Sequence, residues 1–138
     1  MQIKDYYIPI IHTFEFIDTE EEAENSVKTV LGMLVSSVSE DTAQEFAAQL
    51  PDWLDYETLR GDQQNPIPKK PEDCIQALEN SNGFNEKQAT ALMHKTVALT
   101  VQEGTGDLRK MILELPDEWE EIFNQSPKQQ NIKDETVL

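Results

Sequence analysis

Two segments of this chain end in nearly the same sequence. Leu50-Pro51-Asp52-Trp53 closes the first segment, and Leu115-Pro116-Asp117-Glu118-Trp119 closes the second. Before each motif, apolar residues recur at three- and four-residue steps, which is the spacing of one face of an α-helix. The order of predicted elements also agrees: a short helix, a long helix, a medium helix, then a Pro-initiated helix with a tryptophan. The chain is therefore predicted to be all-α, a helical bundle built from two similar multi-helix repeats.

The expected boundaries follow from the breaks in this pattern. We expect one domain over residues 1–124, with repeats at about 7–58 and 71–124. Residues 61–71 contain three prolines and no periodicity, so they are predicted to be an extended linker. Residues 125–138 lack apolar periodicity and are expected to be a disordered tail. The break at Gly104-Thr105-Gly106 is expected to separate the long and medium helices of the second repeat.

Helix starts and stops can be read from capping residues. Asp18 or Thr19 is expected to cap the first long helix, and Ser39 the helix that follows. Asn85 with Gln88 forms a capping-box pattern before the second long helix, after a predicted stop at Asn82-Gly83. The predicted inner face of the first long helix comprises Ala23, Val27, Val30, Leu31, Leu34, Val35 and Val38.

The segment 5–17 is ambiguous. Its apolar residues have helical spacing, and Pro9 is tolerated in a first helical turn, so a short helix is expected. Tyr6, Tyr7, Ile8 and Phe16 are also good strand formers, so an extended segment is the alternative. The residues expected to face inward from this helix are Tyr7, Ile10, Ile11, Phe14 and Ile17.

The charge of the chain limits its partners. Eleven Lys and Arg residues against twenty-seven Asp and Glu residues give a formal net charge of −16. This field repels phosphate backbones and anionic lipids, so nucleic acid and membrane surfaces are poor partners. It accelerates encounter with a basic protein surface. Solubility alone is the other explanation of the acidity.

The cysteine count and the hydropathy pattern bear on location. One cysteine, Cys74, excludes a disulfide within the chain and favours a reducing compartment. The chain has no run of eighteen apolar residues, and its start lacks the features of a signal peptide. A cytoplasmic protein without membrane insertion is therefore expected.

Residue types that often carry catalysis or bind metals do not form a persuasive pattern here. A calcium loop starting at Asp18 requires Gly and Glu where Ala23 and Thr29 stand. His12 is expected at the edge of the core, and His94 as a partly exposed surface residue. Cys74 is expected to be buried rather than nucleophilic. No catalytic, cofactor-binding or metal-binding residue is predicted, and no enzymatic activity.

Trp53 and Trp119 occupy corresponding positions at the two repeated motifs. In a helical bundle such residues are expected to wedge the Pro-initiated helix onto its repeat. Exposed anchors for a binding partner are the alternative, because tryptophan is enriched at interface hot spots.

The same segments resemble a known family. The long helix followed by Ser39-Glu40-Asp41-Thr42-Ala43-Gln44-Glu45-Phe46-Ala47-Ala48-Gln49-Leu50-Pro51, and later residues 107–123 with the second Leu-Pro motif, are similar to the bacterial domain-of-unknown-function family 2267. The resemblance covers about residues 7–124. It implies an all-helical bacterial protein, but no reaction and no catalytic residue. Tyr6-Tyr7-Ile8-Pro9 and the Pro-rich linker depart from the family pattern, which has a more charged first helix and a shorter spacer.

The function expected from these observations is a non-enzymatic protein–protein interaction or regulatory module that binds a basic protein surface. The candidate partner-binding residues are the acidic runs of the two halves: Glu20, Glu21, Glu22, Glu118, Glu120 and Glu121. The alternative is a small-molecule-sensing domain with a pocket between the repeats.

Overall fold

The computed structural model describes residues 7–61, 63, 65–103 and 108–124. All regular structure in these residues is helical, as predicted, and no strand occurs among them. In chain order the elements are α1 (Ile8–Ile11), α2 (Glu20–Ser37), α3 (Glu40–Ala47), the 3₁₀ turn η1 (Asp52–Leu54), α4 (Tyr56–Arg60), α5 (Pro71–Asn82), α6 (Glu86–Glu103), α7 (Arg109–Glu114) and α8 (Glu118–Asn124). The predicted tail and the Gly104-Thr105-Gly106 break lie outside the described residues.

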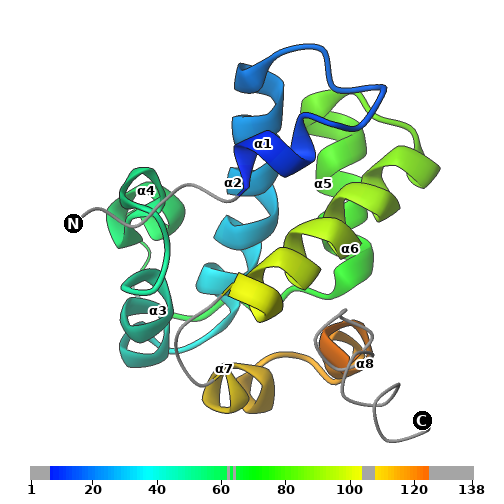
Figure 1. Ribbon diagram of the computed structural model, residues 1–138. Coiled ribbons are helices and arrows are strands. Elements are labelled where there is room, and N and C mark those ends of the chain that lie inside the picture. Colours follow the sequence, from blue (N-terminus) through cyan, green and yellow to red (C-terminus); the bar gives the residue numbers. More distant parts are fainter. Residues whose placement is uncertain (1–6, 62, 64, 104–107, 125–138) are drawn as a thin grey trace, which may run out of the picture.

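The two longest helices, α2 and α6, contact each other, and α5 packs against both of them (Figure 1). Thr19 begins α2 by accepting a hydrogen bond from the N–H of Glu22, whose carboxylate accepts one from the N–H of Asp18. The predicted inner face of α2 is buried along its whole length, which confirms the period: Ala23, Val27, Val30, Leu31, Leu34, Val35 and Val38.

The predicted connection between α5 and α6 is also confirmed. Gly83 ends α5 in the left-handed region at φ 79°, where a residue without Cβ carries no steric penalty. Asn85 and Gln88 then exchange hydrogen bonds of 2.8 and 3.1 Å between side chain and backbone at the start of α6. Local capping chemistry thus determines where α5 ends and where α6 begins.

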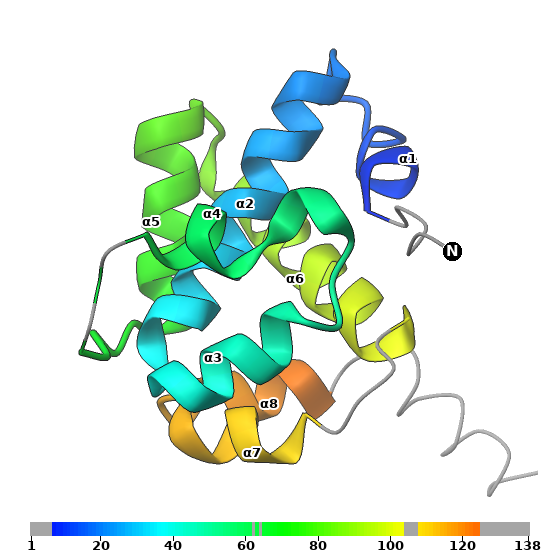
Figure 2. The ribbon, with the colours of Figure 1, turned by 90° about the vertical axis from the view of Figure 1, so that its left-hand side faces the viewer.

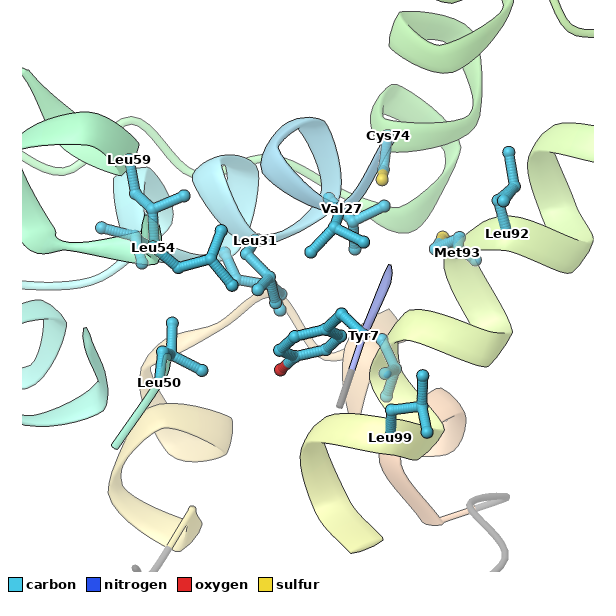
Figure 3. Close-up of a cluster of buried hydrophobic side chains, with 14 of the residues drawn as sticks. Tyr7, Val27, Leu31, Leu50, Leu54, Leu59, Cys74, Leu92, Met93 and Leu99 are labelled. Carbon is cyan, nitrogen blue, oxygen red and sulfur yellow. The ribbon is translucent and has the colours of Figure 1, made fainter. Parts of the chain in front are cut away.

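The buried side chains of the two halves form one hydrophobic cluster. Figure 3 shows Leu31 and Leu54 from the first half converging with Met93 and Leu99 from α6. Cys74 contributes from α5 and has no exposed surface, as expected. Each half therefore completes the core of the other.

The segment after α3 differs from the prediction. A single Pro-initiated helix with Trp53 was expected there, but the structure has two elements, η1 and α4. The division occurs at Asp55, whose extended backbone ends η1 and whose carboxylate accepts from the N–H of Thr58 to cap α4. Helix α4 lies against α2 (Figure 2), and a Cβ at Gly32 would lie 3.3 Å from the carbonyl oxygen of Leu59.

The N-terminal segment is helical for one turn only. Pro9 lies in the first turn of α1, as predicted, and turns follow from His12 onwards. Tyr7 is fully buried and its hydroxyl forms a 2.6 Å hydrogen bond with the hydroxyl of Thr100 on α6. Ile10 was expected inside but is 37% exposed, because a single turn cannot direct all the apolar residues of this segment to one side.

The linker is bonded to the C-terminus of α2. Arg60, which is 5% exposed, donates from Nη1 to the carbonyl oxygens of Val35 and Val38 at 3.1 and 2.8 Å. The N–H of Ile67 donates to the carbonyl oxygen of Ser36 at 2.8 Å, and the N–H of Lys69 to the hydroxyl of Ser37. The bonds from Arg60 and Ile67 satisfy carbonyl groups that a helix C-terminus leaves without partners.

Helix α7 contacts α3 from the other half of the chain. The carboxylate of Glu114 accepts hydrogen bonds from the N–H of Ser39 at 2.8 Å and from the hydroxyl of Thr42. Lys110 and Glu45 form a second link between these helices, with 2.8 Å between Nζ and Oε2. Helix α3 is therefore capped twice, by its own Ser39 and by Glu114 from the second half.

We expect Glu114→Gln to reduce stability at neutral pH and to make less difference in acid. Partial burial raises the pKa of Glu114, but the hydrogen bonds from Thr42 and Ser39 and the charge of Lys110 outweigh it and lower the pKa below the ordinary 4.5. The stabilisation is therefore complete above about pH 4.5 and is lost as the pH falls through the lowered value. Because the site is exposed, the loss at pH 7 should be about 1 kcal/mol.

Urea unfolding at pH 7 and pH 3 measures this difference. Glu15→Gln, in an exposed turn, is the control for removal of one carboxylate. Equal losses for Glu114→Gln at both pH values would contradict the ionic role of the cap.

Candidate functional site

The first acidic run lies at the start of α2. Glu20 and Glu21 are exposed, whereas Glu22 is half-buried and bonded to the N–H of Asp18 at 2.7 Å. Three carboxylates in a first helical turn also complement the positive end of the helix dipole. Glu20 and Glu21 are thus available to a partner, and Glu22 has a structural task.

The second acidic run is on α8. Glu118, Glu120 and Glu121 are exposed. Glu118 lies 3.7 Å from Nζ of Lys70, in an ion pair whose side chains are each more than half exposed. Such a pair contributes little to stability, so this run remains a charged surface rather than a structural brace.

The structure does not bring the two runs together. The start of α2 lies at one end of the molecule and α8 at the other, in both Figure 1 and Figure 2. One small partner cannot contact both runs at once. They are separate candidate surfaces, one in each half of the chain.

The two tryptophans have different environments. Trp119 is fully buried, its Nε1 donates to the carbonyl oxygen of Lys69 at 2.7 Å, and its ring packs against Phe123 with 6.5 Å between centroids. It is a core wedge, as expected. Trp53 also packs against the core cluster, as expected, but it is only half-buried.

A lysine covers the ring of Trp53. Nζ of Lys28, on α2, lies 5.8 Å from the ring centroid and 2.9 Å from Oε1 of Glu24. Hydrogen bonds from Thr58 lower the pKa of Asp55, and the charge of Lys28 adds to this effect. Sequence reasoning missed this arrangement. The four-residue spacing of Glu24 and Lys28 predicts an ion pair on one helix face. The contact with Trp53 depends instead on how α2 packs against η1.

Among the described residues, surface grooves join elements of the two halves or flank the candidate residues. A groove of about 480 Å³ lies between α2 and the end of α5, lined by Glu22, Asn25, Lys28, Thr29, Ser81, Asn82 and Phe84. One of about 410 Å³ lies between α3 and α7, lined by Thr42, Glu45, Phe46, Ala48, Gln49, Leu108, Lys110 and Met111. One of about 450 Å³ includes two candidate residues and is lined by Lys70, Pro71, Glu72, His94, Glu118, Glu121 and Ile122.

The burial predicted from the sequence is correct for Cys74 and His94 and wrong for His12. Burial raises the pKa of Cys74 to about 12, and the charge of Asp73 acts in the same direction, so this thiol is protonated at neutral pH. His94 is half-buried, as expected, and burial lowers its pKa. His12 is exposed rather than at the core edge, because α1 ends before it. No group of three potential metal ligands occurs among the described residues.

The helices give no indication of a membrane-spanning segment. Within the described part of the chain, none of them is both long enough and apolar enough to cross a bilayer.

Comparison with known proteins identifies the family. The model of the family described as "Uncharacterized conserved protein (DUF2267)" matches residues 10–122. The chain belongs to this family, as the resemblance indicated. No match to the chain was found among curated proteins.

Proposed function

We propose that this member of the DUF2267 family is a non-enzymatic interaction module that binds a basic protein surface. The observation that carries the proposal is the net charge of −16 together with exposed carboxylates in both halves. Charges of this kind raise the rate of encounter with an oppositely charged partner more than they lower its rate of dissociation. The same field disfavours nucleic acid. We place the protein in the cytoplasm, where its single cysteine stays reduced.

The proposal includes an internal duplication. Its support is the order of elements in each half and the reciprocal packing of α1 and α5. Helix α1 contacts α2 of its own half and α6 of the other, and α5 contacts α6 of its own half and α2 of the other. Such an arrangement presents one acidic run per repeat. Two partners, or two sites on one extended partner, are therefore accommodated.

The experiment begins with a partner captured at low salt and continues with its association kinetics. The variant for the first run combines Glu20→Lys and Glu21→Lys with Glu22→Gln. Glutamine at position 22 keeps the side-chain oxygen that accepts from the N–H of Asp18. Glu118→Lys, Glu120→Lys and Glu121→Lys test the second. We expect each set to slow association about tenfold at low salt while changing dissociation less than twofold.

A matched control reverses three exposed acids from separate parts of the chain that belong to no proposed binding surface: Glu15, Glu86 and Glu103. It should slow association less than either local set, and 0.5 M salt should remove the differences, because screening then shortens the reach of each charge below about 8 Å. If the partner is acidic, or if its association rate changes neither with salt nor with either set of substitutions, the charge serves solubility alone.

A small-molecule sensor is the second candidate. It is favoured by the 480 Å³ groove between α2 and α5, which draws its lining from both halves. The side-chain amides of Asn25 and Asn82, which line this groove, suit a polar ligand. A rise in melting temperature with one class of metabolite, lost in Asn82→Leu, would favour this function over protein binding.

A further inference from the structure

Trp53, Lys28 and Glu24 form a small site in which an aromatic ring and a carboxylate hold a cation. The ammonium of Lys28 lies over the indole ring, 5.8 Å from its centroid, and pairs with Glu24 at 2.9 Å. Asp55 follows Trp53 by two residues, and its carboxylate accepts a hydrogen bond from the N–H of Thr58. The hydrogen bonds from Thr58 lower its pKa, and the charge of Lys28 acts in the same direction. An aromatic face combined with carboxylates is the chemistry by which proteins recognise lysine and arginine side chains. In this molecule the occupant is a lysine of the same chain.

The site is accessible. The ring of Trp53 is half-buried, and the side chains of Lys28 and Glu24 are 35% and 39% exposed. Asp52, Asp55 and Glu57, which flank Trp53 in the sequence, are all exposed. The segment that presents the ring therefore also presents three exposed carboxylates, and a basic segment is the partner that complements it.

The indole N–H of Trp53 is buried without an acceptor among the described residues. A buried donor without a partner lowers stability. Within the described part of the chain, no hydrogen bond holds the indole ring in this orientation. Trp119, at the corresponding position of the other half, has its N–H bonded to Lys69. Of the two tryptophans, Trp53 is the one whose ring can change orientation without breaking a hydrogen bond to any described residue.

We propose that Trp53, Glu24 and Asp55 bind a lysine or arginine side chain of a basic partner, which replaces Lys28 over the indole ring. This inference rests on the proposed function and names one of its contact points, distinct from the six candidate glutamates. The displaced Lys28 has room to move, since its side chain also lines the groove between α2 and α5. Lys28 thus acts as an internal competitor that weakens binding until the partner supplies a stronger cationic group.

Titration with N-acetyl-tetralysine amide, followed by two-dimensional ¹⁵N NMR at low salt, tests this directly. The two tryptophans provide two indole N–H signals in the intact protein. We expect the Trp53 signal to move with peptide concentration while the Trp119 signal stays in place. No variant is needed for this measurement, so it does not depend on how substitutions affect folding.

Two matched variants test the competition. Lys28→Met keeps an unbranched side chain but removes the ammonium, and should tighten peptide binding about fivefold. Lys95→Met makes the same change at an exposed position on α6 and should alter binding less than twofold. Trp53→Phe keeps an aromatic ring with a weaker cation–π attraction, so binding should weaken about threefold with a melting temperature within about 2 °C of the parent.

Equal effects of Lys28→Met and Lys95→Met would show that Lys28 merely covers the ring, and would overturn this inference. So would a peptide that shifts the backbone signals of α8 and the start of α2 but not the Trp53 indole. That second result would leave the proposed function intact. A peptide that binds nowhere at low salt would contradict both.

Discussion

Replacing Trp119 by alanine is expected to destabilise the protein by about 3–5 kcal/mol, the usual range for emptying a buried aromatic site. Its side chain has no exposed surface and contacts Phe123, so its removal leaves a cavity beside α6 and α7, against which α8 packs. The carbonyl oxygen of Lys69 loses its donor as well. Guanidinium unfolding followed by far-ultraviolet circular dichroism measures the change.

Trp119→Phe separates the ring from its hydrogen bond. It keeps most of the packing but leaves Lys69 without the indole donor, and should lower the free energy of unfolding by about 1–2 kcal/mol. Trp53→Phe is the matched control, because Trp53 has no hydrogen bond to lose among the described residues. A Trp119→Ala protein that melts like the parent but loses a partner would identify Trp119 as an interface residue.

Replacing Arg60 by methionine is expected to destabilise the protein by about 3 kcal/mol. Methionine keeps the buried aliphatic volume but removes the donors that reach Val35, Val38 and Gln63. Three carbonyl groups then lose a charged donor, and α2 loses the positive charge near its C-terminus, where the last turn has no basic residue. Chemical unfolding and hydrogen exchange at the end of α2 report the loss.

Arg60→Lys is the informative comparison. An ammonium is a compact charge and cannot span the positions that the guanidinium fork reaches, so it should recover less than half of the loss. If Arg60→Met leaves protection of α2 unchanged while the linker alone exchanges faster, Arg60 anchors the linker rather than the helix.

Several features of the fold follow from short stretches of sequence. Thr19, Ser39, Gly83 and the Asn85–Gln88 pair were identified from residue type and spacing, and the structure confirms each of them. Capping groups act on a backbone only two to four residues away, so their effect is visible without the rest of the fold. The all-helical class follows from the same local rules.

The candidate site was less predictable. The six glutamates were chosen as charge runs, yet Glu22 turned out to serve as a cap and the two runs lie at opposite ends of the molecule. The lysine site around Trp53 was not anticipated. Spacing along one helix is recorded in the sequence, but the approach of η1 to α2 is not.

By itself, the sequence determined the helices, most of their ends and the burial of the central faces, because these depend on hydrogen bonds and periodicity within a few residues. The tertiary structure alone decided which polar groups meet across the fold. Glu114 caps Ser39 from 75 positions away, and Arg60 reaches Val35 across 25. Such contacts depend on the relative positions of whole helices, which result from packing of the shared core. The difference between a bonded Trp119 and an unbonded Trp53 has the same origin.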